Sequence, residues 1–269
     1  MVPDTMADPL DDIAFLANSA NRVAVLEALT TGAHHRDELR ERVDVSRVTL
    51  ARILDDFEDR RWIERTGQTC RATPLGAWVS EAFAELRETM TSEHRLREVL
   101  PWFPAEQVSF DVRCLRDADI VTPTPTNMWA HVQRGADCFR SAQRARVVST
   151  QTAPPIVEAT KTAVEEYEQR FEAVLTAALI ETVGSNATMA PLFAELLDAP
   201  TVDIYVYEDE LPVTVFLTDG TVGLPLTDDE DIARALVLSE NETVYDWAES
   251  TFEQYRARSD PVDPDAFTA

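Results

Sequence analysis

The chain has 269 residues, 45% of them hydrophobic, and its 49 acidic residues outnumber its 24 basic residues to give a formal net charge of −25. This length suits two domains of ordinary size, and the hydrophobic content excludes a disordered chain. No apolar run approaches the roughly 20 residues that cross a bilayer, which excludes an integral membrane protein. Because residues 1–11 lack the basic start and apolar run of a signal peptide, we expect a cytoplasmic protein.

The charge is unevenly distributed along the chain. Residues 34–75 contain nine arginines and nine acidic residues, so the whole negative excess lies outside this window. Lys161 is the only lysine, and strong acidity with so little lysine resembles the proteins of halophilic archaea, whose acidic surfaces stay solvated in molar salt. A neutral window in such a chain indicates a surface that approaches a polyanion.

The three cysteines, Cys70, Cys114 and Cys138, are widely spaced and odd in number. This pattern indicates neither a disulfide framework nor a zinc site, and we expect no metal and no cofactor. We interpret the cysteines as buried thiols, with a thiol redox sensor as the alternative.

The amino-terminal region is predicted to be helical at first. Its segments are, in chain order, a helix over residues 12–29 with a candidate break at 18–21, a short helix around 39–43, a turn at 44–45 and a helix from 46 to about 61. Ser46 is a natural N-cap for the last helix. The apolar face of that helix repeats at i, i+3, i+4 and i+7 and consists of Leu50, Ile53, Leu54 and Phe57.

A hairpin follows these helices. Two runs of β-propensity, 62–66 and 69–73, flank Gly67-Gln68. Helix, helix, turn, helix and hairpin is the order of a winged helix-turn-helix. The string SRVTLARILDDFEDRRWIERTGQTCRATPLG, with an S-R-x-T helix start and a T-P-x-G after the wing, resembles archaeal regulators of the MarR, ArsR and TrmB group. The resemblance implies a module that binds double-stranded DNA at a promoter or operator.

The DNA contacts expected of this module follow from groove width. The major groove is about 12 Å wide and admits one helix, whose amino end reaches the base edges. The predicted contacts are Arg47, Thr49 and Arg52 to or near bases, Ser46 and Arg36 to phosphates, and Arg65, Gln68 and Arg71 of the wing to the backbone or the adjacent minor groove. The alternative for each arginine is an ordinary solvated surface.

A long connecting helix is predicted from Leu75 to about Leu100. Its apolar residues Val79, Phe83, Leu86 and Met90 are spaced by four, three and four. Such a stripe could pair with its twin in a homodimer, which would match a palindromic operator. Packing of the helix against its own wing domain is the alternative.

Strand-like and helix-like segments alternate from residue 105 onward, which predicts an α/β sensor-like domain with a mixed sheet. The predicted strands are 108–115, 146–150, 202–207, 213–217 and 222–224, with 120–126 as strand or loop. The predicted helices are 129–142, 155–169, 189–197, 229–238 and 243 to about 256, and 171–182 is ambiguous. The fold class is α+β, divided into a disordered start (1–9), the winged helix-turn-helix (10–75), the connecting helix (76–104), an effector-binding and dimerisation domain (105–258) and a disordered tail (259–269).

Three strings of this second domain carry a second resemblance. RARVVSTQTAPP, TVDIYVYEDELPVTVFLTDGTVGLPL and ENETVYDWAESTFEQYR resemble the effector domain of the FilR1-type archaeal regulators. The sequence lacks a Gly-rich phosphate loop, a nucleophile elbow and an H-E-x-x-H motif, and its single lysine excludes a phospholipase D-type H-x-K site. We therefore predict a binding domain and no enzyme.

Candidate ligand residues are placed by topology, since open α/β sheets bind ligands beyond the carboxyl ends of their strands. They are Thr150, Gln151 and Thr152 after one strand, and Tyr207 and Glu208 after another. The only dense basic group of the domain could receive an anionic metabolite or pair with nearby acids, and consists of Arg134, Arg140, Arg144 and Arg146.

The sequence thus predicts a homodimeric transcription regulator controlled by an unidentified small molecule, with no membrane partner. The alternatives are a DNA-associated protein whose C-terminal domain only dimerises, a thiol redox-sensing regulator, and an enzyme fused to a DNA-binding module. An enzyme would require the strand-end residues to converge in one deep pocket.

Overall fold

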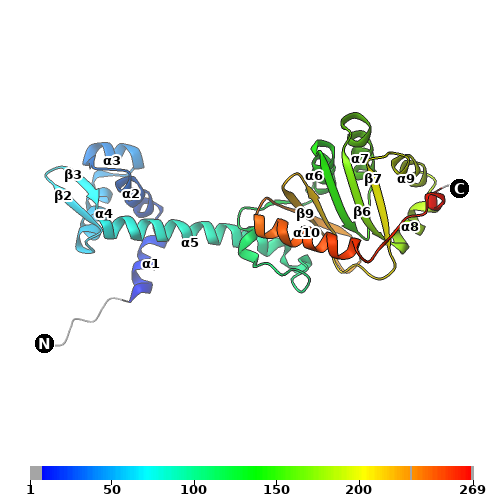
Figure 1. Ribbon diagram of the computed structural model, residues 1–269. Helices are drawn as coiled ribbons and strands as arrows, with labels where there is room; N and C mark the ends of the chain where they lie inside the picture. Colours follow the sequence, from blue (N-terminus) through cyan, green and yellow to red (C-terminus); the bar gives the residue numbers. More distant parts are fainter. Residues whose placement is uncertain (1–7, 231, 268–269) are drawn as a thin grey trace. The chain divides into compact units, whose positions relative to one another are not determined.

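The computed structural model describes residues 8–230 and 232–267 and divides into two compact units, residues 1–91 and 92–269. Each unit has its own sheet and its own hydrophobic core. The architecture is α+β, as predicted, with a winged helix-turn-helix, a long helix and a mixed-sheet domain (Figure 1). Within the described residues, no helix is both long and apolar enough to cross a membrane.

The first unit combines short helices with a three-stranded sheet. Its elements are α1 (Pro9–Ala17), α2 (Ala20–Thr30), β1 (His34–His35), α3 (Arg36–Val43), α4 (Arg47–Asp59), β2 (Ile63–Thr66) and β3 (Thr69–Ala72). β3 lies between β1 and β2 and pairs antiparallel with both. The predicted helix break and the predicted hairpin are both present.

Capping residues set the helix boundaries in this unit. Ser19 starts α2 by accepting a hydrogen bond from the Arg22 N–H, and Ser46 starts α4 by accepting one from the Thr49 N–H at 3.1 Å. Asp44, at φ 52°, ends α3 in the left-handed region, which reverses the chain before α4. The turn between the two helices therefore follows from local sequence.

The predicted apolar face of α4 forms the centre of the first core, where it meets α2, α3 and the wing. Phe15, Phe57 and Trp62 pack ring against ring, with centroids 5.8–6.1 Å apart. Burial of these aromatic rings fixes α4 against the wing, so the exposed side of α4 has a defined orientation within this unit.

α5 (Pro74–Val99) begins in the first unit and ends in the second. Val79 and Phe83 pack against the core of the first unit, whereas Leu86 and Met90 are exposed. The predicted apolar stripe is therefore divided: its first half packs on the wing domain, and its second half faces solvent in this chain.

The second unit is built on an eight-stranded sheet in the order β11-β7-β6-β5-β8-β9-β10-β4. The strands are β4 (Asp119–Val121), β5 (Arg144–Ser149), β6 (Arg170–Thr176), β7 (Val202–Tyr207), β8 (Val215–Thr218), β9 (Thr221–Thr227), β10 (Ala233–Ser239) and β11 (Asp260–Pro261). β5, β6 and β7 run parallel, and the remaining neighbours are antiparallel. The predicted mixed sheet is confirmed.

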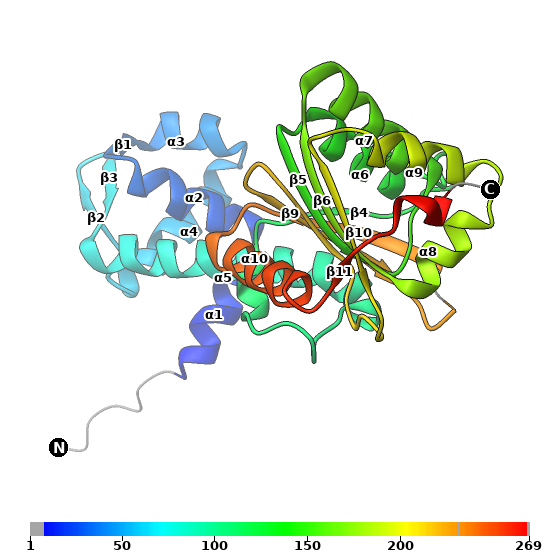
Figure 2. The ribbon, with the colours of Figure 1, turned by 45° about the vertical axis from the view of Figure 1, so that its right-hand side comes forward.

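Helices cover both faces of this sheet (Figures 1 and 2). One face carries α6 (Ala130–Ser141), α7 (Pro154–Tyr167), α8 (Ala177–Gly184) and α9 (Met189–Leu197), and the other carries α10 (Glu242–Arg256). Alternate strand residues serve the two cores: Ala145 and Ala173 belong to the cluster under α6–α9, and Val148 and Val174 to the cluster under α10.

Two predicted elements of this unit are wrong. Residues 108–115 form a loop and a 3-10 helix, η2 (Val112–Leu115), because the Asp111 side chain accepts a hydrogen bond from the Arg113 N–H and starts a helical turn. Residues 229–238 lead into β10, where Leu236 and Val237 enter opposite cores. An apolar run this short fits the residue spacing of a strand and of a helix equally well. Its hydrogen-bonded pairing with β9 and β4 makes it a strand.

The prediction that the chain ends are disordered is also wrong for the end residues that the structure describes, which are ordered. β11 pairs with β7, and Val262 and Phe267 are buried, with the Phe267 ring 5.2 Å from that of Phe193. This hydrophobic contact anchors the tail beyond residue 259. At the other end, Pro9 begins α1, and residues 1–7 lie outside the described residues.

Candidate nucleic-acid interface and ligand pockets

The amino end of α4 presents two arginines to solvent. The Arg47 side chain is 79% exposed, and its guanidinium group lies 4.0 Å from the Asp37 carboxylate. Arg52 is exposed and forms no ion pair with any described residue. Thr49 is half-buried, and its hydroxyl is 2.8 Å from that of Ser46. Two weakly neutralised guanidinium groups therefore stand where the sequence predicts base contacts.

Val48 lies between these residues and is 81% exposed. Sequence reasoning missed it, although its place in the first turn of α4, off the apolar face, was a usable signal. An exposed valine at the amino end of a recognition helix offers a methyl surface for the C5-methyl group of thymine.

The carboxyl half of α4 is acidic and binds the wing. Asp55 and Glu58 form ion pairs with Arg65 of β2, at 2.8 and 3.4 Å. The Arg65 side chain is only 18% exposed, so it links the wing to α4 within the unit. Its predicted DNA contact stays a prediction, with less side chain available than the sequence suggested.

The tip of the wing lies beside the start of α3. The Arg36 N–H donates a hydrogen bond to the Gln68 carbonyl at 3.0 Å, and Gly67, at φ 62°, forms the tight turn that presents Gln68. Gln68 is exposed, Arg36 is half-buried, and exposed Arg71 pairs with Glu64 across the hairpin. The predicted phosphate and wing residues are thus brought onto neighbouring surfaces.

The candidate ligand residues of the second unit are divided among several places. Thr150, Gln151 and Glu208 line a groove of about 800 Å³ at the carboxyl ends of β5, β6 and β7. Gln151 and Thr152 line an apolar cavity of about 170 Å³ between the sheet and its helices. Tyr207 lies on the other face, its ring 5.2 Å from that of Tyr255. Three of these five residues therefore share one groove, whereas Thr152 and Tyr207 do not line it.

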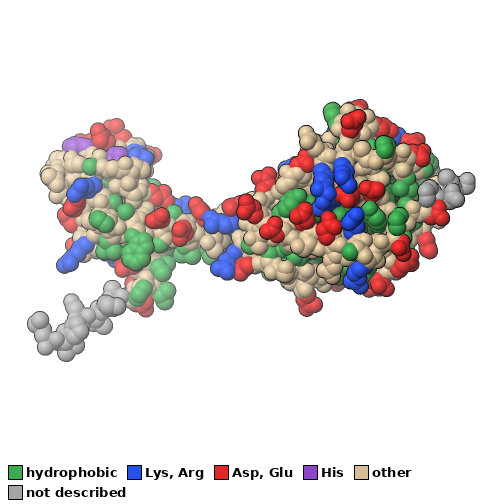
Figure 3. Space-filling view, viewed as in Figure 1, with side chains coloured by type: hydrophobic (Ala, Val, Ile, Leu, Met, Phe, Trp, Pro, Cys, Tyr) green, Lys and Arg blue, Asp and Glu red, His purple; other side chains and the backbone are tan. Residues whose placement is uncertain are grey.

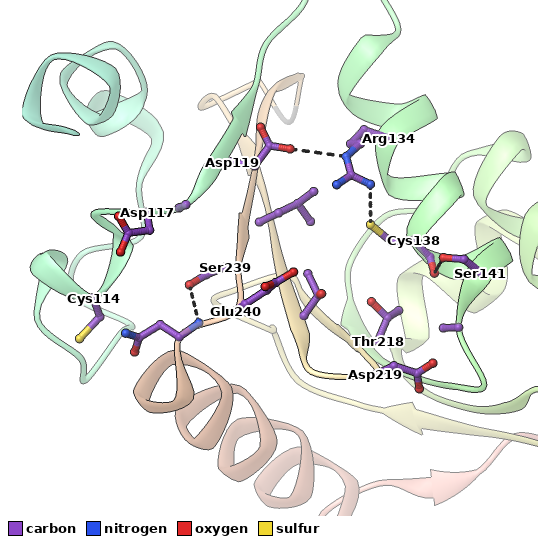
Figure 4. A pocket seen from close by; sticks show the side chains of 15 residues that line it. Cys114, Asp117, Asp119, Arg134, Cys138, Ser141, Thr218, Asp219, Ser239 and Glu240 are labelled. Atoms are coloured by element: carbon purple, nitrogen blue, oxygen red, sulfur yellow. Dashed lines mark hydrogen bonds and ion pairs between the residues drawn. The ribbon is translucent and has the colours of Figure 1, made fainter. Parts of the chain in front are cut away.

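Arg134 lines a polar pocket of about 640 Å³ (Figure 4). Its guanidinium group is 3.5 Å from the Asp119 carboxylate and 3.7 Å from the Cys138 sulfur. Asp117, Asp219 and Glu240 add negative charge to the same walls. Because four carboxylates face one arginine, this pocket disfavours the anionic metabolite that the basic group suggested.

The other arginines of that group also pair with acids. Arg140 pairs with Asp137, and Arg144 and Arg146 lie 2.9 and 3.3 Å from the Glu172 carboxylate. Burial alone would raise the pKa of this carboxyl, but the surrounding arginines hold it below its ordinary value. Figure 3 shows basic and acidic side chains intermixed on the face that carries α10. Arg144 and Arg146 therefore belong to an ion-pair network around the buried Glu172, whereas Arg140 pairs separately on α6.

Two of the three cysteines have the environment of unreactive thiols. Cys70 and Cys138 are buried, and burial raises the pKa of both thiols. Cys114 is half-buried and lies across the polar pocket from Cys138 (Figure 4). A raised pKa lowers the reactive thiolate fraction, which disfavours a redox role for Cys70 and Cys138. The described residues contain no group of three or more side chains arranged to hold a metal ion.

Two family models match the sequence. The model described as the HVO_A0261 N-terminal domain matches residues 10–95, and the model for the middle domain of the methanogenesis regulatory protein FilR1 matches residues 128–258. The two matches fall on the winged helix-turn-helix with most of α5 and on the mixed-sheet domain. No curated protein matches the sequence.

Three solved structures are among those that the comparison with this chain returned. TrmBL2, described as an archaeal chromatin protein with a novel mode of DNA binding, is 13% identical over 94% of this chain and 99% of its own, with a TM-score of 0.43. NucT from Helicobacter pylori is 12% identical, with a TM-score of 0.43, and the phospholipase D family member Nuc from Salmonella typhimurium is 16% identical, with a TM-score of 0.40. Both cover 54% of this chain and 98% of their own. Identities and TM-scores this low assign no activity to this chain.

Proposed function

We propose that this chain, whose sequence matches the models for the HVO_A0261 N-terminal domain and the FilR1 middle domain, is a sequence-specific DNA-binding transcription regulator. It acts as a homodimer whose operator affinity is controlled by a small molecule bound in the second unit. Its acidity with a single lysine supports a cytoplasmic setting of molar salt.

The observation that carries this proposal is the exposed amino end of α4. Arg47, Val48 and Arg52 face solvent there, while the opposite side of the helix is locked into the core. The macrodipole of α4 adds partial positive charge at the same end, which favours approach to phosphates. Side chains held in one orientation on a rigid helix suit direct reading of bases.

A neutral module is consistent with DNA binding at molar salt. The screening length falls to about 3 Å at 1 M salt, so long-range attraction between arginines and phosphates contributes little. Affinity then depends on hydrogen bonds, apolar contacts and shape. An exposed apolar residue such as Val48 becomes more useful under these conditions, because its contact is not screened.

The side chains divide into roles on this proposal. Arg47, Thr49 and Arg52 read bases, with Val48 as the apolar contact. Arg36, Gln68 and Arg71 track the phosphates and the neighbouring groove. Ser46 uses its hydroxyl to cap α4, and Arg65 holds the wing to α4, so both position the reading helix, in addition to any phosphate contact.

The test is fluorescence anisotropy of the full chain in about 2 M KCl with labelled DNA from upstream of its own gene. Wild type is compared with Arg47→Ala plus Arg52→Ala. Two base-contacting arginines contribute roughly 1–3 kcal/mol each, so we expect the double variant to lose at least about thirtyfold in affinity for the preferred sequence.

Arg113→Ala plus Arg140→Ala is the matched control, because it removes two exposed arginines from the second unit with the same change in net charge. It should bind DNA as wild type does. If folded wild type shows no sequence preference at any salt concentration, the proposal is wrong. Equal losses in both double variants would mean that bulk charge, and not α4, drives binding.

A further inference from the structure

The apolar cavity of the second unit lies between the sheet and α6, α7 and α9, and has a volume of about 170 Å³. Its walls are mainly aromatic and aliphatic, including Phe139, Val157, Phe171, Phe193, Phe216 and Leu236. Cavities of about 150 Å³ with such walls hold a molecule the size of benzene. The space therefore matches one ring with a small substituent.

Polar groups of the cavity gather at one edge of the sheet. Gln151 and Thr152 follow β5, and Thr214 precedes β8, which pairs antiparallel with β5. Thr150 and Thr214 place their hydroxyl oxygens 3.5 Å apart at this edge. It is the edge where β5, β6 and β7 end, the usual ligand edge of an open α/β sheet.

His131, in the first turn of α6, contributes to the same cavity and is only 7% exposed. Its Nδ1 has no hydrogen-bond partner among the described residues. Burial lowers the pKa of the imidazole, which is therefore neutral at pH 7 and can donate or accept one hydrogen bond. A buried polar atom without a partner is costly, so a ligand group that bonds to it gains affinity.

The described lining contains no Asp, Glu, Lys or Arg side chain. A charged ligand would lose its hydration without compensation. A nucleotide would bring phosphate charges with the same penalty, and a cavity of about 170 Å³ is too small to hold it. Both classes are therefore disfavoured.

We propose that this cavity binds an uncharged, mainly apolar molecule of about one ring, whose single hydroxyl or carbonyl group hydrogen-bonds to His131. This inference rests on the proposed function, because it gives the chemical class of the small molecule that controls DNA binding. It moves the ligand site away from the polar pocket of Arg134 and into the apolar core.

The experiment is calorimetric titration of the full chain with phenol, benzene and benzoate as probes. Phenol should bind, benzene should bind about five- to tenfold more weakly for want of the hydrogen bond, and benzoate should show no binding. His131→Phe should lower the affinity for phenol to that for benzene. Ala173→Leu adds three carbon atoms to the cavity wall and should weaken both ligands at least about tenfold.

Matched controls are His94→Phe and Ala178→Leu, which make the same changes at exposed positions outside the cavity. If Ala173→Leu does not fold, Thr214→Phe at the half-buried rim blocks the entrance instead. The proposal is overturned if folded wild type binds neither phenol nor benzene, if benzoate binds as well as phenol, or if neither cavity variant changes the affinity.

Anisotropy with operator DNA, run in parallel, separates this inference from the proposed function. Phenol binding without sequence-preferring DNA binding would support the cavity site and contradict the proposed regulatory function. Sequence-preferring DNA binding that the α4 double variant loses, without any phenol binding, would support the proposed function and contradict the cavity site.

Discussion

An exposed valine on a helix that reads DNA can contact only the apolar parts of a base. On the proposed function, Val48 contacts the thymine methyl group, and burying one methyl is worth about 0.8 kcal/mol. Val48→Ala should therefore weaken operator binding about three- to fivefold. Anisotropy with uracil in place of thymine checks the cause: wild type should lose the same factor, and the variant should lose nothing further. An equal loss on uracil DNA for both proteins would place Val48 away from any methyl group.

Glu172 is buried and forms ion pairs with Arg144 and Arg146 on the face of the sheet that carries α10. Its side chain is 5% exposed, and Arg146, 9% exposed, has its guanidinium group 3.3 Å away. Replacing Glu172 costs less than the roughly 3 kcal/mol of a fully broken buried pair, because Arg146 keeps its ion pair with Glu249 at 2.9 Å, and we expect about 1–2 kcal/mol. Glu172→Gln should lower the free energy of unfolding by about this amount at pH 7, measured in urea. Asp111→Asn, at an exposed ion pair, should change it little.

The difference in free energy of unfolding between wild type and Glu172→Gln should depend on pH, and the direction follows from the pKa of Glu172. Because the pKa of Glu172 is lowered on folding, its stabilising contribution is present above its unfolded value of about 4.3 and is lost as pH falls through the folded value. The stability gap between wild type and Glu172→Gln should therefore be constant from pH 7 to about pH 5 and shrink below pH 4. A gap that stayed constant down to pH 2 would show that Glu172 does not titrate differently in the folded chain.

Among single residues, those whose environment is local were predictable. Ser46 could be assigned as a cap because its partner, the Thr49 N–H, lies three residues away. The partners of Arg65 and Arg146 could not be assigned, because Asp55 and Glu249 reach them only through tertiary contact. The distribution of charges along the sequence therefore overstated how many arginines are available to a ligand.

Where β3 meets α5, the T-P-x-G motif has a physical explanation. The Thr73 hydroxyl donates to the Arg61 carbonyl at 2.7 Å and accepts from the Gly76 N–H at 3.1 Å. A Cβ atom on Gly76 would lie 1.9 Å from the Trp62 carbonyl oxygen. Only glycine lets the first turn of α5 approach the end of α4 and the wing this closely.

Gly76→Ala tests this close approach. Alanine gains about 1 kcal/mol of helix propensity, but a clash with backbone forces a shift that costs more, so we expect a net loss of about 2 kcal/mol or more. Gly135→Ala is the matched control in α6, since its Cβ would meet only the ends of flexible side chains, Ile156 at 3.3 Å and Leu236 at 3.7 Å. Thermal unfolding should show a lower midpoint for Gly76→Ala alone. A raised midpoint would mean that propensity outweighs the clash.

Helices and strands, like single residues, could be predicted where their cause lies in the local sequence and not where it lies in tertiary contacts. The helices of the first unit carry their own caps and their own 3.6-residue periodicity, so they were predictable. β10 and β11 exist because β4, β7 and β9 pair with them, and the tail is held by a contact between Phe267 and Phe193. The apolar cavity was hidden for the same reason, because its walls come from separate helices and strands.

At the scale of the whole molecule, α5 keeps an exposed apolar stripe that no described residue covers. Trp78 is 69% exposed, and Leu75, Leu86 and Met90 are exposed on the same side, since the spacings of three, eight and four residues each bring the helix back to one face. A second copy of the helix would bury this stripe and give the two-fold symmetry of a palindromic operator. Half of the predicted stripe packs on the wing core, so the dimer would use a face displaced toward Trp78.

Leu86→Glu plus Met90→Glu should therefore convert a dimer into a monomer, as measured by light scattering after gel filtration. Two carboxylates buried in an apolar seam have no partner to offset their desolvation. Thr91→Glu, on another side of the same turn, adds charge without entering the seam and should leave the dimer intact. The monomer should keep its fold but lose affinity for a two-site operator far more than for a single half-site, because the two half-sites would no longer be bound as one unit. If the double variant stays dimeric, the interface lies elsewhere, and the second unit becomes the surface on which to look for it.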